Sequence, residues 1–154
     1  MLEHNHANVI IRQARLDDAE LLYTWRNDPI VRESSRNTEF FDFTAHISWL
    51  KNTLTDKNRG LYIAEDNNVP VGTIRYDLLN GWYELSWTVD PKQQRKGYGK
   101  KMVELMIALL PGPFFAEIKN NNLASIRMAE SLGMIMEFAN LDILHYTKGK
   151  SNER

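Results

Sequence analysis

The stretch VDPKQQRKGYGKKM, residues 89–102, joins an alternating strand-like run to a run with helical spacing. It contains two glycines, Gly97 and Gly99, and five basic residues. A loop that enters a helix presents unpaired backbone N–H groups and the positive end of the helix dipole. Glycines let a ligand approach this backbone closely. The stretch therefore predicts an anion-binding loop rather than two glycines that only permit a turn.

Two common phosphate-binding motifs do not fit this loop. A dinucleotide-binding fingerprint needs G-x-G-x-x-G, and no third glycine follows Gly99 at the required place. A Walker loop needs Ser or Thr after its lysine, and Lys100 is followed by Lys101. If the loop holds a phosphate, it belongs to a different class of site.

Hydrophobic periodicity predicts strands before and after this loop, with helices between them. The expected strands are 9–15, 60–66, 69–79, 82–90, 114–119 and one or two within 135–148. The expected helices are 16–28, with Asp17 as N-cap and a stop at Pro29, then one from about Thr44, then 98–110 and 122–133. This order predicts an α/β (α+β) fold with a mixed, mostly antiparallel sheet of six to seven strands and about four helices.

The composition favours one soluble domain over residues 1–154. The net charge is -1, which argues against non-specific nucleic-acid binding and requires any phosphate chemistry to rest on a local basic cluster. The absence of cysteine excludes disulfides, thiolate zinc sites and a cysteine nucleophile. No stretch resembles a signal peptide or a membrane span. We therefore expect a cytoplasmic protein with no metal, nucleic-acid or membrane partner.

Two motifs resemble one enzyme superfamily. Gln94-x-x-Gly97-x-Gly99 resembles the Q/R-x-x-G-x-G/A signature of the GNAT superfamily of N-acetyltransferases. Asn122, Ser125, Leu132 and Gly133 resemble the N-x-x-[AS]…L-G-[FM] helix of the same superfamily, and the order of elements also matches its fold. The resemblance implies a sheet that splays between its fourth and fifth strands.

The resemblance also implies acetyl-CoA as co-substrate and assigns residues to it. The loop would hold the pyrophosphate, and the backbone of the splayed fourth strand would contact the pantetheine arm and thioester. The implied cofactor-binding residues are Trp87, Thr88, Val89, Gln94, Arg95, Lys96, Gly97, Tyr98, Gly99, Lys100, Asn122 and Ser125.

Acetyl transfer to an amine needs a base for the amine proton, donors for the developing oxyanion, and an exit for the thiolate. Glu117 is the first candidate base, since its spacing to Asn122 resembles that of GNAT enzymes that acetylate ribosomal-protein N-termini. Glu84, which alternates with Ser86 and Thr88 on the fourth strand, is the competitor, and Thr88 is the third catalytic candidate. Many members carry a tyrosine where this chain has Ala129. Either another group protonates the thiolate (Tyr83, Tyr98, Tyr146 or a water), or the thiolate leaves without a dedicated acid.

Between residues 21 and 54 the chain carries the pattern W-R-N-D-P-x-V-R…H-x-x-W, from Trp25 to Trp49. This pattern resembles acetyltransferases of bacterial nucleotide-sugar pathways, notably pseudaminic-acid biosynthesis. This implies a small-molecule acceptor, an amino sugar linked to a nucleotide. The candidate acceptor-binding residues are Trp25, Arg26, Asn27, His46, Trp49 and Arg75, with Arg32 and Arg36 as further cations. Trp25 could equally pack in the core, His46 could be structural, and Arg75 could form a salt bridge within its strand.

Three alternatives stay open at this stage. Within the superfamily, the acceptor could be a protein N-terminus or a polyamine. In a different class, the chain could bind acetyl-CoA without turnover, which the alanine at position 129 would suit. The oligomeric state is open between a monomer and a homodimer.

Overall fold

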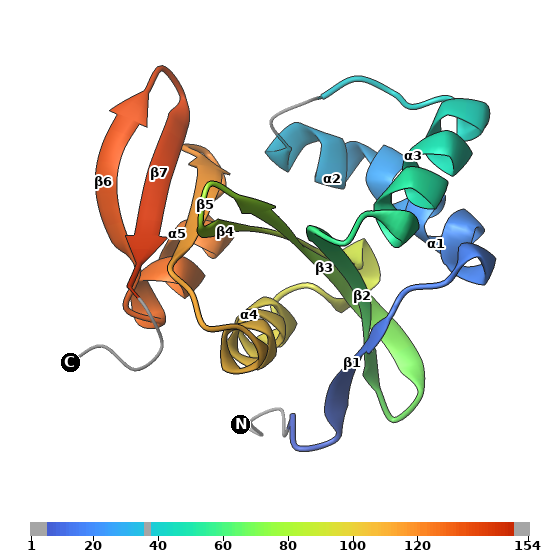
Figure 1. Ribbon diagram of the computed structural model, residues 1–154, viewed down its shortest axis with the longest axis horizontal. Coiled ribbons are helices and arrows are strands. Elements are labelled where there is room, and N and C mark those ends of the chain that lie inside the picture. Colours follow the sequence, from blue (N-terminus) through green and yellow to red (C-terminus); the bar gives the residue numbers. More distant parts are fainter. Residues whose placement is uncertain (1–5, 36–37, 150–154) are drawn as a thin grey trace.

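The computed structural model describes residues 6–35 and 38–149 of the 154-residue chain, with one sheet at its centre (Figure 1). The seven strands of this described part are ordered β1-β2-β3-β4-β5-β7-β6. They are β1 (Val9–Gln13), β2 (Arg59–Asp66), β3 (Val69–Leu79), β4 (Trp82–Val89), β5 (Phe114–Lys119), β6 (Ile135–Asn140) and β7 (Ile143–Lys148). All neighbouring pairs are antiparallel except β4 and β5, which are parallel. The mixed, mostly antiparallel sheet is as predicted.

Helices cover both faces of the sheet. They are α1 (Ala19–Asn27), α2 (Pro29–Ser34), α3 (Phe43–Thr55), α4 (Tyr98–Leu109) and α5 (Leu123–Ser131), with short 3-10 turns at Leu16–Asp18 and Pro91–Gln93. The first three helices lie over one half of the sheet, and α4 lies on the opposite face (Figure 1). Beside α4, α5 packs against β5 and β7. A small hydrophobic core is thus formed on each side of the strands.

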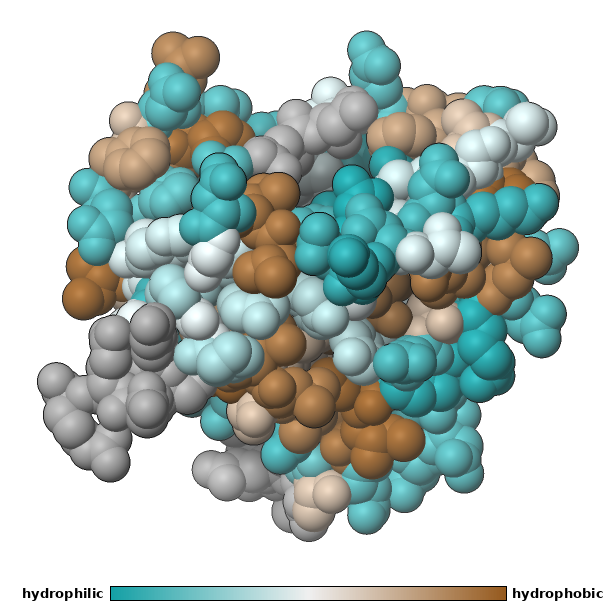
Figure 2. Space-filling view, in the orientation of Figure 1, coloured by the Kyte–Doolittle hydropathy of each residue, from teal (hydrophilic) through white to brown (hydrophobic). Residues whose placement is uncertain are grey.

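The main core lies under α4. Val71, Ile74 and Leu85 of the sheet pack there against Met102 and Met106 of the helix, all of them buried. Hydrophobic residues are nevertheless exposed elsewhere. Figure 2 shows some of them at the end of the β6–β7 hairpin, where Leu141 is 93% exposed. Within the described residues, none of the helices is long and apolar enough to cross a membrane.

The start of the first helix differs from the prediction. Asp18, not Asp17, is the N-cap of α1, and a 3-10 turn precedes it. The Asp18 carboxylate accepts hydrogen bonds from the Arg12 guanidinium at 2.8 and 2.9 Å and from the Arg15 backbone N–H at 2.7 Å. With these partners the Asp18 side chain makes no cap hydrogen bond to α1 itself. Local sequence spacing does not reveal the contact with Arg12 on β1.

A helix not expected from the sequence follows Asp28. Pro29 ends α1 as predicted, but it also occupies the first turn of α2. The Asp28 side chain accepts a hydrogen bond from the Ile30 backbone N–H at 2.9 Å and so caps this helix. Proline is well suited to the first helical position, because the N–H it lacks would be unpaired there. One Asp-Pro pair thus ends one helix and starts the next.

The pairing of β4 with β5 is short. Within the described residues the two strands are in register only at Tyr83–Phe114 and Glu84–Phe115. Beyond Glu84, β4 continues for five residues paired on one side only, with β3. The expected splay between the fourth and fifth strands is present, and it opens toward the N-terminus of α4.

Candidate active site

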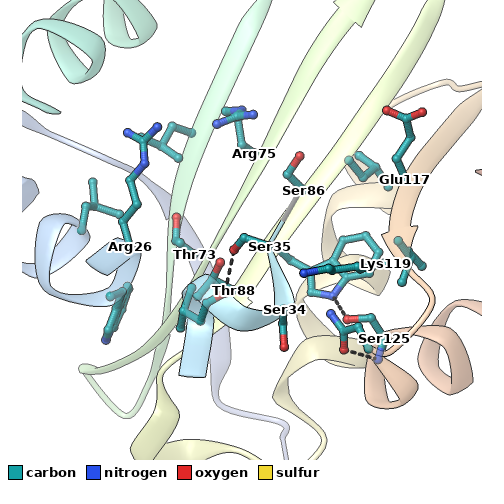
Figure 3. Close-up of a pocket in the computed structure, with 18 of the residues that line it drawn as sticks. Arg26, Ser34, Ser35, Thr73, Arg75, Ser86, Thr88, Glu117, Lys119 and Ser125 are labelled. Carbon is teal, nitrogen blue, oxygen red and sulfur yellow. Dashed lines mark hydrogen bonds between the residues drawn. The ribbon is translucent and has the colours of Figure 1, made fainter. Parts of the chain in front are cut away.

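A cavity of about 540 Å³ lies on the face of the sheet that α1, α2 and α3 cover. We call it the sheet cavity. Its floor consists of side chains that alternate along three strands and so share one face: Thr73 and Arg75 from β3, Glu84, Ser86 and Thr88 from β4, and Glu117 and Lys119 from β5. Figure 3 shows Arg26 at one side of this cavity and Glu117 at the other.

A second cavity of about 460 Å³ lies at the N-terminus of α4. We call it the loop cavity, since residues of the opening stretch border it, among them Gln94, Arg95, Gly97, Gly99 and Lys100. The two cavities meet at residues that border both: Val31, Ser34 and Ser35 from the α2 segment, Trp87 and Thr88 from β4, and Asn122 and Ser125 from α5. One continuous cleft therefore runs from the basic loop to the two glutamates.

The loop has the backbone expected of an anion site. Arg95 and Gly97 adopt left-handed φ values of 66° and 82°, and Gly97 is the N-cap of α4 without any side-chain cap. The first N–H groups of α4 thus have no side-chain acceptor, and the positive end of a 12-residue helix faces the cavity. A left-handed residue at the N-cap favours glycine, because a Cβ there is strained.

The polar groups of Lys96 and Tyr98 bond to other residues around the loop and do not point into the cavity. The Lys96 ammonium donates to the Gln93 side chain at 2.9 Å. The Tyr98 hydroxyl donates to the Asp66 carboxylate at 2.6 Å, and this hydrogen bond together with burial raises the pKa of Tyr98 to about 12. The bond ties the first turn of α4 to the end of β2.

Trp87 and Ser125 define the junction of the two cavities. The Trp87 indole N–H donates to the Ser125 hydroxyl oxygen at 3.1 Å, and the Asn122 side chain accepts from the Ser125 backbone N–H at 3.2 Å (Figure 3). Asn122 is thus the N-cap of α5 and holds Ser125 in place. Ser125 accepts from Trp87, so its own proton remains available for a group in the cleft.

No tyrosine hydroxyl of the described residues borders the junction. Ala129 is fully buried in the core between α5 and the sheet, so its position does not face either cavity. The Tyr146 hydroxyl donates to the Glu130 carboxylate at 3.0 Å. Tyr83 packs between Tyr76 and Phe114, and Tyr98 bonds to Asp66. The three tyrosines considered as replacements for the missing one are engaged elsewhere.

Both candidate bases border the sheet cavity. Glu84 is 9% exposed and lies where β4 and β5 still pair. Glu117 lies further along β5, its side chain is 28% exposed, and one carboxylate oxygen is 3.7 Å from His145 Nδ1. The structure thus brings together the two carboxylates that the sequence leaves as alternatives.

Arg26 lies between two aromatic rings at the side of the sheet cavity formed by α1 and α3. Its guanidinium carbon is 3.5 Å from the centre of the Phe41 ring and 4.6 Å from the centre of the Trp49 ring. Burial, and secondarily the charge of Arg75, lower the pKa of Arg26 to about 10. Arg75 itself donates to the Asp77 carboxylate at 2.9 Å, so it is both a salt-bridged strand residue and part of the cavity wall.

The other predicted acceptor residues have structural contacts. Trp25 is 3% exposed and packs in the core beneath α1 and α3 while its edge borders the cavity. His46 is fully buried, with Nε2 3.1 Å from the Ala19 carbonyl oxygen; burial lowers its pKa, so it is neutral at pH 7. Asn27 borders neither cavity, because its amide exchanges hydrogen bonds with the backbone of Phe41. Arg36 lies outside the described residues.

A family model described as an acetyltransferase (GNAT) domain matches residues 8–135. The chain belongs to the GNAT acetyltransferase family. The predicted class, an N-acetyltransferase that depends on acetyl-CoA, is therefore confirmed, together with the fold that the loop motif and the α5 motif imply. No curated protein matches the sequence significantly.

Several solved structures share the GNAT fold. A domain from Methanocaldococcus jannaschii is 27% identical, with a TM-score of 0.80 over 92% of this chain and 97% of that one. The yncA protein from Salmonella typhimurium with its cofactor acetyl-CoA is 20% identical, with a TM-score of 0.77 over 95% and 96%. Spermidine N-acetyltransferase from Vibrio cholerae, in complex with CoA and spermine, is 13% identical, with a TM-score of 0.83 over 94% and 97%.

Sequence reasoning missed several residues of the cleft. Thr73 and Lys119 could have been predicted to border the cavity, since each lies two residues along a strand from a predicted site residue, Arg75 or Glu117, and so shares its face of the sheet. Ser34 and Ser35 could not be found in this way, because α2 was not expected. Phe41 has no periodic pattern around it, and only the fold brings it against Arg26.

Proposed function

We propose that this chain transfers the acetyl group of acetyl-CoA to a primary amine of a small molecule, with a nucleotide-linked amino sugar as the favoured acceptor. The observation that carries the proposal is the continuous cleft, in which a basic loop and an uncapped helix N-terminus lie at one end and two glutamates at the other. Acetyl-CoA supplies the reactive thioester when it is bound in this cleft.

The loop cavity fits the phosphate end of the donor. Backbone N–H groups from Arg95 to Lys100 would bind the pyrophosphate, with the left-handed Gly97 leaving its oxygens room to approach. Thr88 and its neighbours on β4 lie beyond the last β4–β5 pair, so their edge of the strand faces the cleft. These backbone groups would orient the pantetheine arm and stabilise developing negative charge.

Glu117 is our first choice for the base that accepts the amine proton. Its partly exposed carboxylate lies in the cavity wall next to His145, so a proton that it accepts can pass on to solvent. Glu84 faces the same cavity but is more buried, and it is the alternative. Ser125 Oγ is placed to donate its proton to the departing sulfur, because Trp87 already occupies one of its acceptor positions.

Acceptor binding would take place in the sheet cavity. Its volume of about 540 Å³ is within the roughly 300–1,000 Å³ of small-molecule sites. The aromatic wall at Phe41 and Trp49 suits a ring, and hydroxyls of Thr73 and Ser86 suit the hydroxyls of a sugar. The cavity contains Arg26, Arg75 and Lys119 as well as Glu84 and Glu117, and a polyamine, which carries only positive charge, would meet repulsion from the three cations.

The test is turnover with acetyl-CoA and a panel of amines, measured as acceptor-dependent release of free thiol. The panel contains a uridine-diphosphate-linked 4-amino sugar, the corresponding free amino sugar, spermidine and an alanine-terminated peptide. Glu117→Gln should lower kcat at least about tenfold while the Kd for acetyl-CoA stays within about twofold. Glu84→Gln serves as the matched variant on the neighbouring strand.

The outcomes separate the alternatives. A loss of kcat in Glu84→Gln alone would transfer the role of base to Glu84. Preference for spermidine or the peptide would refute the amino-sugar acceptor but leave the transferase intact. Tight acetyl-CoA binding without turnover of any amine would instead support a binding module.

A further inference from the structure

Arg26 carries a partly buried charge that no carboxylate of the described residues neutralises. Its Nη1 atom is buried and has no hydrogen-bond partner, and no carboxylate of the described residues lies within ion-pair distance of its guanidinium. Buried charges in proteins are normally paired, because an unpaired one loses its hydration without compensation. The lowered pKa of this group reflects that cost.

The surroundings of Arg26 add to the positive charge. Arg75 lies near the same Trp49 ring, with its guanidinium carbon 5.7 Å from the ring centre, and its charge contributes to the lowered pKa of Arg26. Its charge is shared with Asp77, which also pairs with Arg59 at 3.0 Å. Lys119 borders the same cavity from β5, but on the side of Glu117, and its ammonium donates to the Glu33 carbonyl oxygen at 3.0 Å (Figure 3). Among the described residues Arg75 is thus paired with a carboxylate, whereas Arg26 has no carboxylate within ion-pair distance.

The aromatic rings fix the direction in which Arg26 can bind. Phe41 and Trp49 cover the guanidinium at 3.5 and 4.6 Å, and their contacts leave its N–H edge for hydrogen bonds. The planar edge of an arginine matches the two oxygens of a carboxylate or phosphate. Arg26 is thus oriented before any ligand binds.

We propose that Arg26 determines acceptor specificity by binding an anionic group, a carboxylate or a phosphate, on the molecule whose amine is acetylated. The inference rests on the proposed acetyl transfer and states the class of acceptor, an amine that also carries an anionic group. The two ends of the cavity differ in charge: Arg26 lies at one side and Glu117 at the other, with Arg75 and Ser86 between them (Figure 3). An acceptor with both an amine and an anion would match both ends, whereas a simple polyamine would match only one.

The first experiment measures binding without turnover. Wild type saturated with CoA, so that the loop cavity is filled, is titrated with uridine diphosphate, inorganic pyrophosphate or glutarate. Binding is followed by intrinsic tryptophan fluorescence, to which Trp49 beside Arg26 contributes. We expect at least one of the three anions to bind and Arg26→Gln to weaken it at least about tenfold, as for loss of charged hydrogen bonds. Which anion binds distinguishes a phosphate from a carboxylate.

The second experiment compares amines that differ only in the anion. Phosphoethanolamine is compared with ethanolamine, lysine with cadaverine, and the nucleotide-linked amino sugar with the corresponding free amino sugar. We expect kcat/KM to favour the anionic member of at least one pair, and Arg26→Gln to remove this preference through KM. Arg26→Lys should restore part of it, because the charge returns without the planar edge.

Arg32 was predicted as a further acceptor-binding cation, but it borders neither cavity. Arg32→Gln is therefore the matched control, since Arg32 also has a buried guanidinium nitrogen without a hydrogen-bond partner in the described chain and lies near an aromatic ring, Phe40. It should behave as wild type in both experiments. Equal anion affinity in wild type and Arg26→Gln would overturn the inference, as would no anion preference in any amine pair. If no amine is acetylated, the proposed function fails, and the fluorescence titration alone decides the role of Arg26.

Discussion

Gly72 on β3 does not border the cleft, but its replacement should displace a residue that does. It lies opposite Val89 in the β3–β4 ladder, next to Thr88, which borders both cavities. A Cβ at Gly72 would be 2.6 Å from the Thr88 carbonyl oxygen and 2.8 Å from Met102 Sδ. Gly72→Ala therefore forces a methyl group against the strand that is proposed to orient the donor.

The size of the effect follows from these distances. Carbon–oxygen contacts are comfortable at about 3.3 Å or more, so the two strands must separate by roughly 0.7 Å near Thr88. The Met102 side chain can rotate away, but the backbone carbonyl can move only with its strand. Such overpacking costs about 1–3 kcal/mol, or about 2–12 °C in Tm for a chain of this size. A displacement of this order at a reacting centre lowers kcat/KM by about 10- to 100-fold.

The assay is thiol release at a temperature well below the Tm of every variant, with Tm measured by calorimetry. Gly60→Ala is the control: its added methyl would collide with the Tyr76 ring on the same sheet, and neither residue borders a cavity. We expect both variants to lose stability and only Gly72→Ala to lose kcat/KM at least about tenfold. Full activity in Gly72→Ala, or an equal loss in Gly60→Ala, would refute the link between Thr88 and catalysis.

Three further predictions concern the loop and two hydrogen-bonded pairs. Gly97→Glu should raise the Kd for acetyl-CoA at least about 100-fold, because it adds strain and negative charge at the loop, and calorimetric titration would measure this; an unchanged Kd would exclude the loop as the phosphate site. The hydrogen bond of Tyr98 to Asp66 stabilises the fold below the ordinary tyrosine pKa of about 10, and this contribution is lost as pH rises through about 12. Tyr98→Phe should remove that alkaline dependence of Tm; if the wild-type and variant curves stay parallel between these pH values, the bond contributes nothing. The hydrogen bond with Arg12 lowers the pKa of Asp18 in the folded protein. This pair therefore stabilises the fold above the ordinary aspartate pKa near 3.8, and the stabilisation is lost as pH falls through the lower pKa of the folded state. Asp18→Asn should lower stability at pH 7 by about 1.5–3 kcal/mol in chemical denaturation and flatten the acid limb, and an unchanged acid limb would contradict this.

Much of the fold could be predicted because its signals are local. Strand alternation in β4, from Tyr83 to Val89, assigns one set of side chains to the core under α4 and the other to the cavity. The glycines of the loop and the Asn122 cap are read directly from short motifs. The helix α2 could not be found in this way, because an Asp-Pro pair indicates the end of a helix from sequence alone and here it also begins one.

The site was predictable in its donor half and much less so in its acceptor half. The loop cavity is built from consecutive residues near Gly97, so sequence neighbours are also spatial neighbours. The environment of Arg26 combines Phe41 from a loop and Trp49 from α3, which no spacing rule connects. Asn27 illustrates the same limit, since its amide holds the backbone of Phe41, 14 residues away.

The short pairing of β4 with β5 has a consequence for how the molecule stays together. In the described chain only two residue pairs join β4 to β5, so few hydrogen bonds connect the two parts of the sheet. Packing of the strands against α4 and the core beneath it must therefore hold much of the two parts together. A ligand lying along the open edge of β4 would act as a substitute strand. The connection between the two halves would then depend on whether the donor is bound. The Trp87 and Val89 amides, which alternate with amides bonded to β3 and so face the open edge, should exchange hydrogen faster in the ligand-free protein and slow markedly when the donor is bound.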